Sequence, residues 1–151
     1  MKLRIVAIKS KRASAKNSAM AQLAEEYRSR LSHYVDVSSE EVRSEDGVIH
    51  LLESSRGRTA PILVCLDSSG KQFSSTELAQ WIGQHQDTGT QQLLFAIGGP
   101  DGLTDKVLTR APFTLSLGKL TLPHELARII LLEQLYRAFT ILKGHPYHSG
   151  H

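Results

Sequence analysis

The sequence predicts an α/β fold in which a mostly parallel sheet is covered by helices on both faces. Five strand-like segments alternate along the 151 residues with five helix-like segments, and such alternation is typical of a parallel sheet. Most of the strand-like segments are short, continuous apolar runs, as expected for strands that are buried on both faces. No internal repeat, linker or low-complexity run divides the chain, so we expect one domain over residues 1–151.

The first two strands and helices are predicted within residues 3–57. Residues 3–8 form a β-branched apolar run that predicts a strand, and residues 35–42 predict a weaker one. Residues 16–34 carry apolar side chains at helical spacing, and Val48, Ile49, Leu51 and Leu52 suggest a short amphipathic helix that ends near Gly57. The stripe that should be buried on the longer helix consists of Met20, Leu23, Ala24, Tyr27, Leu31 and Tyr34.

The middle of the chain predicts a third strand and a third helix. Residues 62–66 form an apolar run, and the Asp-Ser-Ser-Gly sequence of residues 67–70 is typical of a turn. Ser74 and Glu77 have the spacing of a capping box, which marks the start of a helix. The buried side of that helix would include Leu78, Trp81 and Ile82.

Two glycine loops organise the C-terminal third. Residues 93–97 predict a buried strand, which Gly98-Gly-Pro-Asp-Gly102 follows. Adjacent glycines let the backbone turn sharply and let a ligand approach without meeting a Cβ. They stand at the carboxyl end of a strand, where open α/β sheets bind ligands. A short helix, a strand over residues 113–117 and a second glycine loop over residues 118–122 come next.

The last predicted helix runs from His124 to Leu142 and is apolar almost all round. Pro123 precedes it and is placed in the first turn, where a missing N–H costs nothing. On a helical wheel only Glu133, Arg137 and Thr140 gather on a narrow polar stripe. A helix this apolar does not lie on the surface of a monomer, so either the core or a partner must cover it.

The net charge of +3 is modest but unevenly distributed. Residues 1–16 carry six basic side chains and no acidic one, whereas residues 36–53 carry six acidic side chains and one basic one. This asymmetry favours a polyanionic partner near the first loop, although a solvated basic face would explain it equally well.

Composition indicates a cytoplasmic protein without a metal. The single cysteine, Cys65, permits no internal disulfide and is typical of a reducing compartment. No apolar run approaches the length of about 20 residues that a membrane span needs, and the N-terminus lacks the apolar core of a signal peptide. The histidines form no metal-binding spacing with cysteine or acidic residues.

Four motifs in the last third of the chain resemble those of the ribosomal RNA large subunit methyltransferase H family. They are Ile97-Gly-Gly-Pro-Asp-Gly-Leu103, Ser116-Leu-Gly-Lys-Leu-Thr-Leu-Pro-His124, Glu133-Gln-Leu-Tyr-Arg-Ala138 and His145-Pro-Tyr-His148. The resemblance implies a homodimeric SPOUT-class enzyme with a deep trefoil knot at its C-terminal end. It also implies S-adenosylmethionine as the methyl donor and N3 of a pseudouridine in 23S rRNA, within the ribosome, as the acceptor.

The same resemblance implies a cofactor site around the two glycine loops. Without it, Leu66 would be read as a core strand residue, and the glycines as an ordinary turn between a strand and a helix. The cofactor-binding residues that it implies are Leu66, Gly98, Gly99, Leu117, Gly118, Lys119, Leu120, Thr121 and Leu122.

Candidate catalytic and RNA-binding residues lie near both ends of the chain. Arg137 can hold a phosphate or an imide oxygen but cannot act as a base. His148 can titrate near neutrality, and Tyr147 can stack on a base turned out of its helix. The alternatives are a surface ion pair between Arg137 and Glu133 and a frayed polar terminus. The remaining RNA contacts are expected from Lys9, Lys11 and Arg12 in the first loop, although relatives usually have a glycine near Lys9.

Two other functions compete with methyl transfer. The first is a non-catalytic ribosome-binding or RNA-binding protein that keeps the fold without the cofactor. The second is a small dinucleotide-binding enzyme, which is disfavoured because no G-x-G-x-x-G follows the first strand. His124, in the first turn of the last helix, is interpreted as structural.

Overall fold

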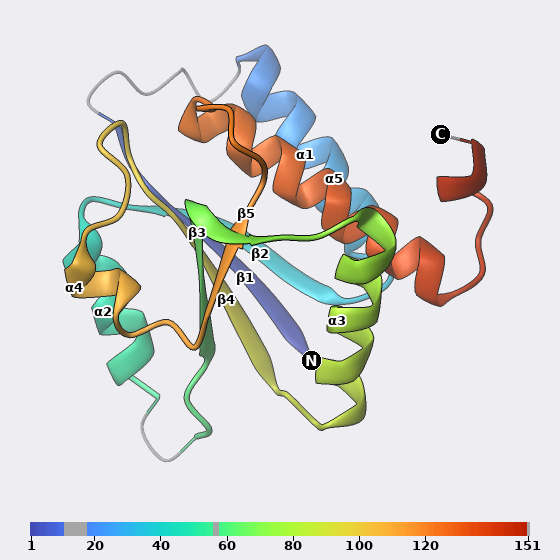
Figure 1. Cartoon of the computed structure of the whole chain (residues 1–151), viewed down its shortest axis with the longest axis horizontal. Coiled ribbons are helices and arrows are strands. Elements are labelled where there is room, and N and C mark those ends of the chain that lie inside the picture. The colour runs from blue at the N-terminus through green and yellow to red at the C-terminus, as the bar shows by residue number, and fades with distance from the viewer. Residues whose placement is uncertain (11–17, 56–57, 151) are drawn as a thin grey trace.

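A parallel sheet forms the centre of the computed structural model, which describes residues 1–10, 18–55 and 58–150. Within this part of the chain, five strands lie in the order β2-β1-β4-β3-β5, and every neighbouring pair is parallel (Figure 1). The predicted parallel sheet is therefore confirmed. The strands are β1 Lys2–Ile8, β2 Asp36–Val42, β3 Ile62–Gln72, β4 Gln92–Ile97 and β5 Phe113–Ser116.

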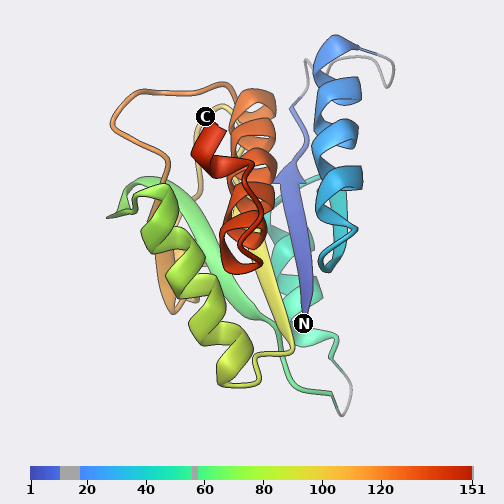
Figure 2. The ribbon, with the colours of Figure 1, turned by 90° about the vertical axis from the view of Figure 1, so that its right-hand side faces the viewer.

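Helices cover both faces of this sheet, as predicted. Helices α1 (Ala19–Leu31), α3 (Ser75–Asp87) and α5 (His124–Leu142) share one face, and Figure 2 shows α5 lying between the other two. The shorter helices α2 (Glu45–Glu53) and α4 (Asp105–Leu108) pack against each other on the opposite face. A 3₁₀ turn, η1 (His148–Gly150), follows the last helix.

Strand β4 explains why the sheet has two cores. Its side chains alternate between faces, so that Leu93 and Phe95 pack toward α1, α3 and α5, whereas Leu94 and Ala96 pack toward α2 and α4. All four residues are fully buried. The continuous apolar run seen in the sequence therefore reflects a strand that has no solvent-facing side.

The predicted bounds of two helices were wrong. Helix α1 is shorter than the predicted 16–34. The Ser18 side chain caps its start by accepting from the Ala21 N–H at 3.1 Å, and the helix ends at Leu31. Helix α2 spans Glu45–Glu53 and so ends before the predicted end near Gly57. Residues 16 and 57 lie outside the described part of the chain.

The apolar stripe on α1 is also less buried than predicted. Ala24 and Leu31 are buried, whereas Leu23 is 40% exposed. Met20, Tyr27 and Tyr34 are half-buried and pack against the edge of the core. Helical spacing thus identified the correct face of α1 but not how far it sinks into the molecule.

The turn predicted at residues 67–70 is a bulge inside a longer strand. Leu66 and Lys71 both pair with Leu115 of β5, so the four residues between them bulge out of the sheet. A Cβ on Gly70 would lie only 2.6 Å from the Thr114 carbonyl oxygen. Glycine is required there because β3 and β5 approach each other closely, and local turn propensity does not report such an approach.

Helix α5 has the predicted bounds, His124–Leu142. Pro123 is its N-cap, one position earlier than predicted, and its carbonyl accepts the Ala127 N–H at 2.9 Å. Thr140 was wrongly placed on a polar stripe: it is fully buried, and its hydroxyl donates to the Arg137 carbonyl at 2.6 Å. Much of the apolar surface of α5 is covered by α1, α3 and the sheet of its own chain.

No helix in residues 1–10, 18–55 and 58–150 has the length and hydropathy needed to cross a bilayer. The C-terminal trefoil knot that the resemblance implies stays a prediction.

Candidate cofactor site and C-terminal cluster

A cavity of about 700 Å³ opens at the bulge of β3 and the carboxyl end of β4, beside the start of α5. Ligands of open α/β sheets bind at this edge. The two glycine loops, far apart along the chain, both contribute to its wall. The lining residues are Leu66, Asp67, Ser68, Ile97, Gly98, Gly99, Pro100, Asp101, Gly102, Leu117, Gly118, Leu120, Thr121, Leu122, Pro123, His124 and Ala127.

The first loop is folded tightly against itself. The Gly102 N–H donates to the Gly99 carbonyl at 2.9 Å, and Gly102 has a left-handed φ of +74°. A Cβ on Gly98 would lie 2.5 Å from the Gly102 carbonyl carbon. Glycine is therefore required at position 98 by the packing of the loop's own backbone. The sequence prediction had considered only the close approach of a ligand.

The second loop is fixed by a buried serine. The Ser116 side chain accepts from the Gly118 N–H and donates to the Gly118 carbonyl, both at 3.1 Å. Gly118 has a φ of +132°, which L side chains rarely adopt. The backbone then turns outward, and Leu120 is 82% exposed at the rim of the cavity.

Eight of the nine cofactor-binding residues implied by the resemblance line this cavity. Lys119 is the exception: Gly118 and Leu120 line the cavity, whereas Lys119 does not. The sequence reasoning also missed Asp67, although its place directly after the apolar core of β3 could have indicated it. His124, interpreted as structural, lines the cavity as well.

Asp67 brings a carboxylate into a wall made largely of apolar side chains and backbone. Its Oδ2 accepts from the Ser69 N–H at 3.0 Å and from the Ser69 hydroxyl. These two bonds fix the orientation of the carboxylate within the bulge of β3. A carboxylate held in this way can accept from a ligand hydroxyl or pair with a ligand cation.

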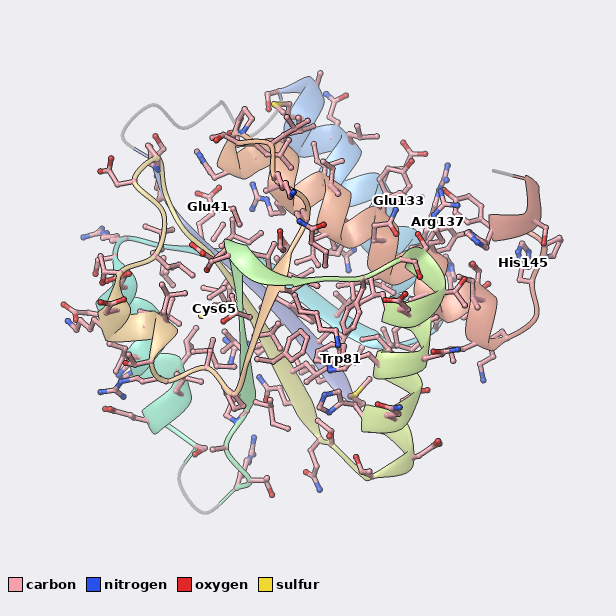
Figure 3. All side chains as sticks on the ribbon, viewed as in Figure 1. Glu41, Cys65, Trp81, Glu133, Arg137 and His145 are labelled. Atoms are coloured by element: carbon pink, nitrogen blue, oxygen red, sulfur yellow. The ribbon has the colours of Figure 1, made fainter. Side chains whose placement is uncertain are left out.

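The predicted catalytic residues gather at the other end of α5 (Figure 3). Arg137 donates from Nη2 and Nε to Glu133 Oε1, at 2.5 and 3.1 Å. Its Nη1 lies 3.1 Å from Nδ1 of His148, and because arginine can only donate, this nitrogen of His148 is the acceptor. The ion pair that was considered as an alternative for Arg137 is therefore present. Its side chains are only 13% and 16% exposed.

Tyr147 completes this C-terminal cluster, which consists of Glu133, Arg137, Tyr147 and His148. Its hydroxyl donates to Glu133 Oε1 at 3.1 Å, and its ring lies 5.0 Å from Arg137 Cζ. An edge-to-face contact with Tyr136, at 4.8 Å between ring centroids, holds the other side of the ring. Burial and the bond to Glu133 raise the pKa of Tyr147 to about 12, so the hydroxyl stays protonated at neutral pH.

The cavity and the C-terminal cluster of one chain lie far apart. His124 lines the cavity and Arg137 anchors the cluster, and a helix that rises 1.5 Å per residue separates these positions by about 20 Å. A single chain therefore does not bring the predicted catalytic residues to the predicted cofactor site.

Of the three basic residues predicted to contact RNA in the first loop, Lys9 is the one that the structure describes. Lys9 is exposed, its N–H donates to the Val42 carbonyl at 2.8 Å, and it follows Ile8, whose side chain faces Gly99. Lys11 and Arg12 lie outside the described residues. Ion pairs neutralise much of the acidic charge in residues 36–53. They join Arg4 to Glu40, Arg128 to Glu41, Lys106 to Asp46 and Arg110 to Glu53.

No cluster of three or more His, Cys, Asp or Glu side chains in the described part of the chain could hold a metal ion.

Comparisons with known proteins agree with this architecture. A family model described as "Predicted SPOUT methyltransferase" matches residues 1–148. The chain is 52% identical over 151 residues to the ribosomal RNA large subunit methyltransferase H of Koribacter versatilis, and the match covers 100% of both chains.

Two solved structures have a similar fold at low sequence identity. A probable methylase family protein from Haemophilus influenzae Rd KW20 gives a TM-score of 0.58 at 12% identity, over 96% of this chain and 69% of that one. The SpoU methyltransferase AviRb from Streptomyces viridochromogenes, in complex with the cofactor AdoMet, gives 0.51 at 16% identity, over 91% of this chain and 59% of that one.

Proposed function

Because this chain belongs to the ribosomal RNA large subunit methyltransferase H family, we propose that it methylates N3 of a pseudouridine in 23S rRNA with S-adenosylmethionine as donor. The acceptor would be presented by the assembled ribosome, which would place the enzyme in the cytoplasm. The observation that carries this proposal is the cavity formed by the two glycine loops. Membership of the family makes the chain a methyltransferase; the cofactor, the acceptor atom and the ribosomal context are proposed.

The cavity suits the proposed cofactor in size and chemistry. Its volume of about 700 Å³ falls within the range of small-molecule sites, about 300–1,000 Å³. Leu66, Leu117 and Leu122 offer apolar contacts to an adenine ring, and the glycine backbones offer amide and carbonyl groups. Asp67 would accept from the ribose hydroxyls or face a positive charge of the cofactor. When bound, S-adenosylmethionine supplies a methyl group on a positively charged sulfur.

Methyl transfer needs the acceptor nitrogen in line with that methyl group. Positioning of this kind can supply about 7–11 kcal/mol of rate enhancement. The acceptor nitrogen is an imide whose proton would pass to solvent water, and the fixed charge of Arg137 would stabilise the anion that forms. While Arg137 donates to Nδ1 of His148, the neutral ring carries its proton on Nε2. In this arrangement His148 would donate to a substrate oxygen rather than remove the imide proton.

A second copy of the chain would unite the two parts of the site. The C-terminal cluster lies about 20 Å along α5 from the cavity of its own chain, so it would act at the cavity of a partner. In a two-fold symmetric dimer both sites would be completed in this way. The exposed Leu120, at the rim of the cavity, would be covered by the partner. The basic first loops with Lys9, Lys11 and Arg12 would then widen the RNA-binding surface.

Calorimetry with S-adenosylmethionine, followed by methylation of ribosomes from a strain lacking the gene, tests this function. We expect binding, and incorporation of one methyl group at a 23S pseudouridine. The absence of binding would refute the cofactor assignment and favour a non-catalytic RNA-binding protein, whereas binding without methylation of 23S rRNA would refute the proposed acceptor.

Co-expression of two inactive variants tests the shared site. Gly98→Val, whose side chain would clash with the backbone of Gly102 and Leu103, should abolish cofactor binding at the cavity, and Arg137→Ala damages the cluster. If each site combines the cavity of one chain with the tail of the other, random pairing should restore activity at about a quarter of the sites. No restoration would show that each chain uses its own tail.

A further inference from the structure

We propose that Glu45, a residue outside the cavity, positions the first glycine loop for binding of the cofactor. This inference rests on the proposed function, because it concerns affinity for the ligand of that cavity. Glu45 is the first residue of α2, and Thr104 lies just beyond the glycine loop, 59 positions further along the chain. The carboxylate thus connects the cavity wall to a helix that has no part in lining it.

The contact between Glu45 and Thr104 engages both oxygens of the carboxylate. Oε1 accepts from the Thr104 N–H at 2.6 Å, and Oε2 accepts from the Thr104 hydroxyl at 2.6 Å. Hydrogen bonds to an ionised carboxylate are shorter and stronger than bonds between neutral groups. Because Thr104 donates both bonds to one carboxylate, they also fix the direction in which the chain leaves the loop at Thr104.

The position of Thr104 is transmitted to the cavity through a short, closely packed backbone. Gly98 contacts the backbone of Gly102 and Leu103 so tightly that a Cβ would not fit, and Gly102 is bonded to Gly99. Leu103 is buried with Val48 of α2 in the second core. A shift at Thr104 therefore moves Gly98 and Gly102, both of which line the cavity.

The C-terminal side of the loop is held by the burial of Leu103 and Val107 and by the two hydrogen bonds to Glu45. Helix α4 has only four residues, too short to be stable alone. Thr104 is its N-cap, but the Thr104 side chain makes no capping bond within the helix, because its hydroxyl is directed to Glu45. The carboxylate of α2 thus takes over the role of an anchor that the sequence of the loop itself does not contain.

Two ion pairs also connect α2 to the segment around α4, and they provide matched controls. Asp46 pairs with Lys106, and Glu53 pairs with Arg110. These side chains are largely exposed, and their partners lie beyond the loop, on α4 and after it. If Glu45 merely helped to attach α2 to α4, removing the charge at Asp46 or Glu53 should have a similar effect.

Glu45→Gln and Glu45→Ala test the proposal beside the controls Asp46→Asn and Glu53→Gln. We expect calorimetry with S-adenosylmethionine to show an affinity about tenfold lower for Glu45→Ala, because losing two charge-assisted bonds frees the loop. Glu45→Gln keeps the shape and one acceptor, so it should show a smaller loss. The controls should bind as the wild type does, and saturating cofactor should restore methylation by the Glu45 variants.

Amide hydrogen exchange without cofactor provides a readout that does not depend on the ligand. Exchange in residues 98–104 should be faster in both Glu45 variants and unchanged in both controls. Wild-type affinity and exchange in Glu45→Ala would overturn the proposal, as would equal effects in the controls. A wild-type protein that binds no S-adenosylmethionine would refute the proposed function, whereas the exchange measurement would still decide whether Glu45 holds the loop.

Discussion

Replacing Gly98 with alanine adds one methyl group at the tightest point of the cavity wall. The new Cβ would lie 2.5 Å from the Gly102 carbonyl carbon and 2.8 Å from the Leu103 nitrogen. Both distances are about 1 Å shorter than the optimal separation of such atoms. The clashing atoms belong to the backbone and cannot rotate away, so the loop itself must move. Overpacking of this kind typically costs about 1–3 kcal/mol.

Gly99→Ala is the matched control, because the nearest atom to its new Cβ would be Ile8 Cγ2 at 3.8 Å, an ordinary contact. Urea unfolding should show a loss of about 1–3 kcal/mol for Gly98→Ala and a change within about 0.5 kcal/mol for Gly99→Ala. Calorimetry should show that Gly98→Ala weakens the binding of S-adenosylmethionine by about tenfold or more. Wild-type stability and affinity in Gly98→Ala would refute the account of the loop.

Four further predictions concern other parts of the molecule. Asp67→Asn keeps the size of the side chain but removes its charge, and calorimetry should show an affinity for S-adenosylmethionine about tenfold lower; unchanged affinity would remove Asp67 from the site. Burial raises the pKa of the Cys65 thiol to about 12, so iodoacetamide should label Cys65 only after unfolding in urea, and rapid labelling of the native protein would contradict its burial. Burial lowers the pKa of His85, so the native state takes up a proton less readily than the unfolded state. His85 should therefore contribute stability above about pH 6.5, which is lost as the pH falls through its native pKa, and urea unfolding should show a weaker acid dependence in His85→Gln. Deleting residues 147–151 should leave S-adenosylmethionine binding nearly intact and abolish methylation, whereas full activity in a ribosome assay would dismiss the tail.

The fold was predictable because its main signals are local. Residues 93–97 are continuously apolar since β4 is buried on both faces, and α5 has caps and a composition that fix its bounds at His124 and Leu142. The bulge of β3 was not predictable from local pattern. Gly70 is required by the approach of the Thr114 backbone, a contact between segments far apart in the sequence.

The candidate site was predictable in part and for a different reason. The glycine loops at Gly98 and Gly118 were indicated by motifs, and the structure brings them to one cavity. Asp67 was missed because its place in the cavity depends on the bulge. The catalytic roles of Arg137 and His148 stay a prediction. Both residues lie far from the cavity of their own chain, and only packing decides to which surface a tail returns.

The acidic segment shows the same limit of sequence reasoning. Residues 36–53 were interpreted from charge alone, whereas several of their carboxylates bond to residues elsewhere in the chain. Glu45 is the clearest example, because its partner Thr104 gives no charge signal in the sequence.

Hydrogen exchange of the wild-type protein with and without S-adenosylmethionine tests most directly whether the two glycine loops form the cofactor site. The cofactor should slow exchange together in residues 98–102 and 117–122, and leave the outer helices α2 and α4 largely unchanged. Protection elsewhere, or in only one of the two loops, would contradict the account.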